Sequence, residues 1–327
     1  HYGLKAKTGE LLWRRYVGYE TTLHPRRLTP QADSDILAAD LRQEHVLRLK
    51  AETGELVWAC PIDEAFTDPI LDGKQILVPA LSGRLFVLDA ETGACSRNVS
   101  IPQKLSVGPG IGPSQRLYQV GQHSNVYVLD SQTLECREVF YLGHRDGTVV
   151  IPPIVTLGYV LIAENAGQDY CELHVLSTKN GLELKPAMKP IRLAGRVVVP
   201  PLQSASRVIV VTDLGQVRML EINTSNPEQP LMDVVDPLPA SFRTPRLSYS
   251  VFDAGRLWIG NSRFSRYDIQ TSRNRMNCPW IRNERDAFVA PPQVSGDVVF
   301  HLRRREGSSA YTASAINGDD GKAIWEI

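Results

Sequence analysis

Three short motifs in this sequence could carry chemistry. His144-Arg145-Asp146 has the residue order of a kinase catalytic loop, in which the aspartate accepts the proton of the attacking hydroxyl. The run Gly108–Gly112 (GPGIG) could cradle a phosphate with backbone amides. The segment Asn317–Gly321 (NGDDG) offers side-chain oxygens of the kind that bind calcium.

Each of these motifs lacks something that its chemistry requires. A kinase loop has an asparagine five residues after the aspartate, and this chain has Ile151 there. The glycine run lacks the GxGxxG spacing, a following helix and a Walker lysine, while the acidic segment lacks the spacing and the closing glutamate of an EF-hand. We interpret the three as a connecting loop, a strand entry and a repeat turn.

Metal and nucleophile patterns are missing too. The chain has no HExxH, no GxSxG, no CxxC and no Cys/His spacing of a zinc site. We therefore predict no metal, no cofactor and no catalytic activity, and mostly reduced, structural thiols. The residues surveyed are the histidines His1, His24, His45, His123, His144, His174 and His301 and the cysteines Cys60, Cys95, Cys136, Cys171 and Cys278.

The composition is that of a globular protein with balanced charge. The 36 basic and 36 acidic residues cancel, so the totals give no indication of a nucleic-acid binder. No apolar run approaches the roughly 20 residues that span a bilayer. The first residues have neither an initiator methionine nor the pattern of a signal peptide, so we expect this chain to be part of a longer one.

A repeated turn organises the whole chain. Its clearest copies are AKTGELLW (6–13), AETGELVW (51–58) and LDAETGACSR (88–97), and weaker copies follow. We mark each copy by its glycine or the equivalent residue, the marker residue. The intervals between markers range from 39 to 49, which is typical of a four-stranded propeller blade. The marker residues lie at positions 9, 54, 93, 134, 181, 225, 272 and 321.

Between the turns, short segments rich in valine, isoleucine, leucine and aromatics alternate with the period of a strand, as in Arg84–Ala90 (RLFVLDA) and Arg207–Asp213 (RVIVVTD). No segment has a convincing helical pattern. The sequence therefore predicts one all-β domain over residues 1–327, an eight-bladed β-propeller of four-stranded antiparallel blades. Because a single strand precedes Gly9, we expect the first blade to be incomplete and its missing strands to come from residues outside this chain.

The turn with its trailing tryptophan resembles the tryptophan-docking motif of propellers with PQQ-like (pyrroloquinoline-quinone-type) repeats, in which each tryptophan packs on the neighbouring blade. The spacing Gly-x-x-x-Trp is intact at three copies. Elsewhere Arg97, Glu138, Lys185, Gln229 and Met276 occupy the tryptophan position. The residues expected to dock blade to blade are Gly9, Trp13, Gly54, Trp58, Gly93, Gly181, Gly321 and Trp325.

Within this family, the resemblance points to two kinds of protein. Quinoprotein dehydrogenases hold their cofactor with a vicinal disulfide, a calcium ion and a catalytic aspartate, and no such set aligns here. The outer-membrane assembly factors of the BamB type are non-catalytic scaffolds, so the resemblance implies a protein-binding role in the periplasm or cell envelope. Two alternatives remain: a sensor or accessory domain of a larger envelope protein or kinase, and a divergent quinone-dependent oxidoreductase.

Loops on a rigid β scaffold are where binding usually occurs, and the loops between second and third strands should share one face. We predict a monomeric domain whose partner is another protein with an acidic surface, because Arg256–Arg305 holds ten arginines against four acidic residues. Alternatively, these arginines are paired or solvated. Asn98 and Asn223 begin N-glycosylation triplets. The candidate contact residues are Gln43, Glu44, Ser82, His123, Gln168, Asp169, Asp213, Arg263, Arg303 and Arg304.

Overall fold

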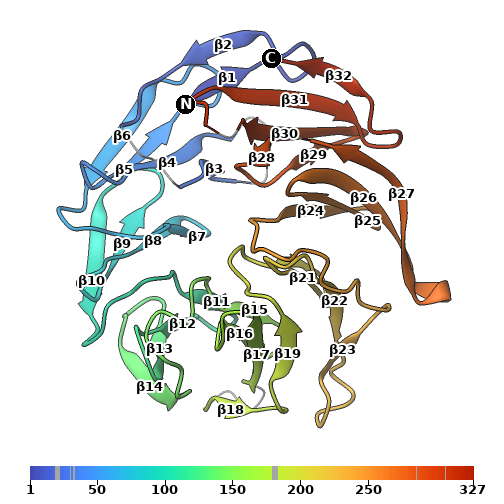
Figure 1. The fold of residues 1–327 in the computed structure, drawn as a ribbon. Coiled ribbons are helices and arrows are strands. Elements are labelled where there is room, and N and C mark those ends of the chain that lie inside the picture. Colours follow the sequence, from blue (N-terminus) through green and yellow to red (C-terminus); the bar gives the residue numbers. More distant parts are fainter. Residues whose placement is uncertain (19–22, 30, 32–33, 179–182, 285, 306) are drawn as a thin grey trace. The chain divides into compact units, whose positions relative to one another are not determined.

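The computed structural model describes the chain except for residues 19–22, 30, 32–33, 179–182, 285 and 306 (Figure 1). The described residues form β-strands and a single one-turn 3-10 helix, η1 (Thr271–Arg273). Two compact units emerge from the internal contacts. The first comprises residues 1–5 and 10–155, and the second comprises residues 6–9 and 156–327.

The first unit contains a two-stranded sheet and three four-stranded sheets, all antiparallel. The two-stranded sheet pairs β1 (Tyr2–Leu4) with β2 (Leu11–Arg14). The four-stranded sheets follow one another along the chain. They are β3 (Arg26–Arg27), β4 (Ile36–Asp40), β5 (His45–Leu49) and β6 (Leu56–Pro61); β7 (Ile70–Asp72), β8 (Gln75–Pro79), β9 (Arg84–Asp89) and β10 (Cys95–Ser100); β11 (Gly110–Gly112), β12 (Arg116–Val120), β13 (Asn125–Asp130) and β14 (Cys136–Tyr141).

The other four sheets, whose strands lie almost wholly in the second unit, have the same meander order. In two of them one strand position is split into two short strands, β18 with β19 and β28 with β29. The sheets are β15 (Ile154–Thr156), β16 (Tyr159–Glu164), β17 (Tyr170–Ser177), β18 (Lys185–Pro186) and β19 (Ile191–Ala194); β20 (Leu202–Ser204), β21 (Arg207–Val211), β22 (Val217–Ile222) and β23 (Leu231–Asp233); β24 (Tyr249–Asp253), β25 (Arg256–Gly260), β26 (Arg263–Gln270) and β27 (Arg275–Asn283); β28 (Ala287–Phe288), β29 (Gln293–Ser295), β30 (Val298–Arg304), β31 (Tyr311–Asn317) and β32 (Ala323–Glu326).

The chain is therefore a β-propeller of four-stranded antiparallel blades, but the predicted number of blades is wrong. Among the described residues seven sheets have the four-strand order of a blade, not eight. The repeat around Gly9 provides only the hairpin of β1 and β2, which is two strands short. Counting repeat turns overestimates the number of blades because a turn needs only two strands.

The middle strand β8 is apolar on both faces because neighbouring sheets cover both of them. In β8, Ile76 and Val78 pack with residues of β4 to β6, whereas Leu77 between them packs with residues of β12 and β13. Such two-sided burial explains the continuous apolar runs. The outer strands alternate instead, and β10 and β14 bury only every second side chain in part.

A polar side chain closes the turn between the third and fourth strands. The Asp89 carboxylate accepts hydrogen bonds from the backbone and hydroxyl of Thr92, which lowers the pKa of that carboxyl. Asp130 accepts the equivalent backbone bonds. The marker residue adopts positive φ in both turns, and at the second this is Leu134 with φ of 60° in place of glycine.

A hydrogen bond from a tryptophan of the preceding sheet holds the repeat turns at Gly54 and Gly93. The indole Nε1 of Trp13 donates to the carbonyl of Ala51, 2.8 Å away, and the ring covers Gly54. Trp58 repeats the contact at Ala90 and Gly93, 3.3 Å away. In both cases the acceptor lies three residues before the marker glycine, and we call it the docking carbonyl.

The same geometry survives where the sequence motif is lost. Arg97 stands in the tryptophan position and its guanidinium donates to Ser131, the equivalent docking carbonyl, at 3.4 Å. Trp280 donates to Gly318 at 3.4 Å, so this blade keeps its tryptophan, and the assignment of Met276 to that position is wrong. The reason is a longer hairpin: Trp58 follows its cross-strand partner by ten positions, and Trp280 follows Arg266 by fourteen.

The docking set continues in the second unit. Trp325 donates to the carbonyl of Ala6 at 2.9 Å and covers Gly9. Gly181 lies outside the described residues. The pairing of third and fourth strands shifts register beside several of these turns, as between Arg48 and Leu49, which is a β-bulge that redirects the outer strand.

Replacement of Gly93 by alanine tests whether the close approach of the indole matters beyond backbone strain. A Cβ at Gly93 would lie 2.6 Å from Cδ2 of Trp58, whereas a Cβ at Gly73, which also has positive φ, meets nothing within 4 Å. We expect Gly93→Ala to lower the free energy of unfolding by about 3 kcal/mol and Gly73→Ala by about 1 kcal/mol. Urea unfolding followed by circular dichroism measures both, and equal losses would contradict the docking interpretation.

Candidate functional site

In the second unit, the hairpin ends between second and third strands form hydrogen bonds with the segments that connect successive blades. The side chain of Asn165 donates to the carbonyl of Val197 and accepts from its amide, at 3.0 and 2.8 Å. The amide of Gly195 donates to the carbonyl of Asp169 at 2.6 Å. The β16–β17 hairpin end, which carries the exposed Gln168 and Asp169, is therefore held by the segment that enters the next blade.

Asp213 anchors the next hairpin end instead of offering itself to a partner. Its side chain is 4% exposed, and its carboxylate accepts the amide of Arg196 at 2.7 Å. Its carbonyl accepts the amide of Arg246, while Leu214 accepts those of the loop that follows β23. The prediction of Asp213 as a contact residue is therefore corrected, because a carboxylate that caps buried backbone amides belongs inside.

Between the sheets that begin with β20 and β24, these loops surround a small cavity of about 80 Å³. Its polar lining comes from an arginine, an amide and three hydroxyl groups, and apolar side chains form the rest. The polar residues are Arg263, Asn261, Ser241, Ser265 and Tyr267. Phe242 is among the apolar ones and lies against Gly215 in the β21–β22 hairpin end.

Arg263 is the charged group of this cavity. It is the first residue of β26, it is exposed, and it has no salt bridge among the described residues. Burial raises the pKa of Tyr267, so its hydroxyl stays protonated at neutral pH and can donate. The cavity thus combines a cation with neutral donors, which suits a carboxylate.

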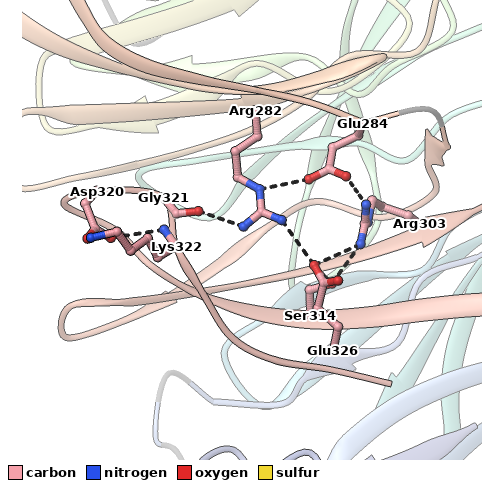
Figure 2. A network of polar contacts seen from close by, with 8 residues as sticks. All are labelled: Arg282, Glu284, Arg303, Ser314, Asp320, Gly321, Lys322 and Glu326. Atoms are coloured by element: carbon pink, nitrogen blue, oxygen red, sulfur yellow. Dashed lines mark hydrogen bonds and ion pairs between the residues drawn. The ribbon is translucent and has the colours of Figure 1, made fainter.

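Arg303 departs from the prediction because its side chain lies inside the last blade. It is 6% exposed and forms an ion pair with Glu284, and it donates to Ser314 and Glu326 at 3.1 and 3.2 Å (Figure 2). Arg282 completes this network, donating to Glu284 at 3.0 Å and to Glu326 at 3.2 Å. A guanidinium held by two carboxylates is not available to a partner.

The rest of the arginine-rich sector is largely paired as well. Of the nine described arginines from Arg256 to Arg305, five form salt bridges: Arg256, Arg266, Arg282, Arg303 and Arg305. Arg304, which like Arg263 was predicted as a contact, is exposed at the end of β30. Arg285 lies outside the described residues. The alternative that these arginines are paired thus describes most of the sector.

His301 lies beside this network in an apolar cage. Its ring centroid is 4.7 Å from that of Phe264 and 5.2 Å from that of Phe288, and neither ring nitrogen has a hydrogen-bond partner among the described residues. Burial, and then the charges of Arg303 and Arg282, lowers the pKa of His301 to about 3. The imidazole is therefore neutral at physiological pH.

The candidates of the first unit also lie at hairpin ends. Gln43, Ser82 and His123 are exposed, and Glu44 is half-buried with φ of 58°. Ser82 donates to the Glu64 carboxylate, and the amide of His123 donates to a side chain of the segment between β10 and β11. These hairpin ends present polar side chains to solvent.

One set of side chains could hold a metal ion, and the search for sequence motifs missed it. Glu164, Glu172 and His174 place one ligand atom each within 4.8 Å of one another. They come from two strands paired by a hairpin, so their spacing matches no linear metal motif. The usable signal was an acidic residue at the end of one strand followed by Glu-x-His at the start of the next.

Comparison with known proteins supports the fold and the family resemblance. A family model described as outer membrane protein assembly factor BamB matches residues 2–96. The structure resembles that of BamB from Moraxella catarrhalis, with a TM-score of 0.61, 14% identity, and coverage of 90% of this chain and 85% of that one. It also resembles the computationally designed Ika8 protein, with a TM-score of 0.68, 10% identity, and coverage of 91% and 85%.

No curated protein matches the chain. Among the described residues, none lies in a helix with the length and hydrophobicity that a membrane crossing requires. The structural matches show the fold of a β-propeller, and the family match over residues 2–96 shows a similarity of that part of the chain to the BamB family.

Alanine substitution should affect stability very differently at the two neighbouring arginines, Arg303 and Arg304. We expect Arg303→Ala to lower the free energy of unfolding by about 3–5 kcal/mol, because it leaves Glu284 buried without its partner. Arg304→Ala, at an exposed position, should change it by less than about 0.5 kcal/mol. Chemical unfolding of both variants measures the contrast, and equal stability of the two would contradict the buried network.

Because His301 is neutral in the folded protein, we expect acid to lower the free energy of unfolding. The unfolded state binds a proton near pH 6.5 and the folded state only near pH 3, so stability falls as the pH drops below about 6.5. Between pH 7 and pH 4 the loss from this group is on the order of 3 kcal/mol. His301→Phe should be at least as stable as the parent at pH 7 and should lack this loss. The free energy of unfolding in urea is measured for both proteins from pH 7 to pH 4. If the two lose the same stability over this range, His301 is not responsible for the loss.

Proposed function

We propose that this propeller of PQQ-like repeats is a non-catalytic scaffold that binds another protein through the hairpin ends of its second unit. The matched family is described as an outer membrane protein assembly factor, and the fold is shared with a protein of that name. These likenesses support a protein-binding role at the level of the family. The contacts around the cavity support the particular surface.

The observation that carries the proposal is the state of Arg263. Most arginines nearby in the sequence are neutralised by carboxylates, whereas this one lines a cavity with hydroxyl groups and has no acidic partner in the described structure. The planar guanidinium of an arginine can bind a carboxylate bidentately. We therefore propose that an aspartate or glutamate side chain of the partner enters this cavity.

The loops that surround the cavity suit a binding surface because they are already ordered. Backbone hydrogen bonds join the hairpin end at Leu214 to the amides of Ser241 and Phe242, and Asp213 joins it to Arg196. A surface that is held in place before binding loses little conformational entropy when a partner arrives. Binding then depends on shape and charge, and no bond is made or broken.

We further propose that the protein works in the periplasm or cell envelope, as the BamB resemblance suggests. A sensor or accessory role and a quinone-dependent oxidoreductase were the alternatives considered from the sequence. No contact among the described residues favours either of them over the scaffold.

Charge reversal at the cavity tests the proposal. We expect a bait carrying Arg263→Glu to lose at least 10-fold of the partner that the parent chain captures from an envelope extract of the source organism, because a repelled carboxylate costs more than about 1.4 kcal/mol. The matched control is Arg273→Glu in η1, an exposed arginine between β26 and β27 that forms no salt bridge in the part of the chain that the structure describes.

Capture should be unchanged in the Arg273→Glu bait and partly retained in Arg263→Lys. Quantitative mass spectrometry of the eluates gives the ratios. Equal capture by the parent, Arg263→Glu and Arg273→Glu baits would rule out this cavity as the contact.

A further inference from the structure

A second site lies on the β16–β17 hairpin, apart from the cavity. Glu164 ends β16, and Glu172 and His174 lie at the start of β17. Glu164 and Glu172 are directly opposed across the two strands, and His174 stands two residues further along the same face. The backbone pairing therefore directs one imidazole and two carboxylates to a single point.

These groups are largely withdrawn from solvent. Glu164 is 8% exposed, and the side chain of His174 is 15% exposed. The Nε2 atom of His174 lies 2.9 Å from a carboxylate oxygen of Glu164, and all three ligand atoms lie within 4.8 Å of one another. Surface carboxylates seldom converge in this way with a half-buried imidazole among them.

The site carries an excess of negative charge. Two carboxylates directly opposed across strands repel each other, and more strongly where water is scarce. Arg192 is opposite Glu172 in the neighbouring strand, but it is exposed and its guanidinium lies over the ring of Tyr170, 3.8 Å away. No salt bridge joins Arg192 to Glu172 in the described structure.

The neighbouring Cys171 takes no part in this set. This thiol is buried, and it precedes Glu172, so it points to the opposite face of the strand.

We propose that Glu164, Glu172 and His174 bind a divalent transition-metal ion of the zinc class. One imidazole nitrogen with two carboxylate oxygens suits such ions, whereas calcium and magnesium prefer oxygen ligands alone. Donor atoms on one zinc ion lie about 3.3–3.5 Å apart, given bonds of about 2.0–2.1 Å. Small side-chain rotations bring the three groups to those distances, and the remaining coordination positions belong to water.

The ion would take the place of the hydrogen bond between His174 and Glu164, and it would hold the end of this hairpin. That hairpin end includes Asp169, whose carbonyl is bonded to Gly195. Metal occupancy would therefore stiffen one edge of the hairpin-end surface. The metal site does not depend on the proposed function, since neither Arg263 nor the cavity takes part in it.

Titration of the chelator-treated 327-residue chain with ZnCl₂ in a calorimeter tests this inference. We expect one equivalent of zinc to bind and the melting temperature to rise, with no such response to CaCl₂ or MgCl₂. Glu172→Gln and His174→Gln should each weaken zinc binding by about 10-fold or more. His123→Gln, at an exposed histidine of another hairpin end, is the matched control and should bind as the parent does.

Cobalt binding identifies the ligands independently. The visible spectrum should show d–d bands without a thiolate charge-transfer band, because Cys171 faces away from the site. The inference fails if zinc does not bind stoichiometrically, if both ligand variants bind zinc like the parent, or if the thiolate band appears. Unfolding measured in the presence of chelator confirms that each variant is folded, so that a loss of binding is a loss of ligands.

Discussion

The fold depends on a hydrogen bond from one outer-strand side chain to a docking carbonyl on the next repeat turn. A four-stranded blade alone cannot bury both of its apolar faces, so it is stable only when neighbours cover it at a fixed spacing. Apolar packing supplies most of the free energy but tolerates sliding. The N–H donor of Trp13, Trp58 or Arg97 meets a fixed backbone acceptor and so sets the register between blades.

Near the end of the chain, two arginines that lie close to hairpin ends differ in whether carboxylates neutralise them. Arg303 and Arg263 both lie near hairpin ends, yet Arg303 is enclosed by Glu284 and Glu326, whereas Arg263 forms no salt bridge among the described residues. Carboxylates contributed by β32 and by the residue after β27 make the difference. The charge of a segment therefore says little about its binding surface until the partners of each side chain are known.

The sequence predicted the strands, the turns and the family resemblance because these follow local rules. The period of the turns and the alternation of apolar residues are visible along the chain, and Asp89 closes its turn as expected. The buried Arg303, the longer hairpin that moves Trp280 and the convergence of Glu164 with His174 were not predictable in this way. Each depends on which strands pair and in what register, and a single sequence does not specify that.

The docking carbonyl has a consequence for how such proteins are recognised. The residue that carries this carbonyl contributes only its backbone to the hydrogen bond, so its side chain can vary. The acceptor residues are Ala51, Ala90, Ser131, Gly318 and Ala6. The donor can also change, since a guanidinium replaces an indole. The family match covers residues 2–96, where three turns keep their glycines. A contact of this kind can therefore persist where the tryptophan of the sequence motif is lost, as it does between Arg97 and Ser131.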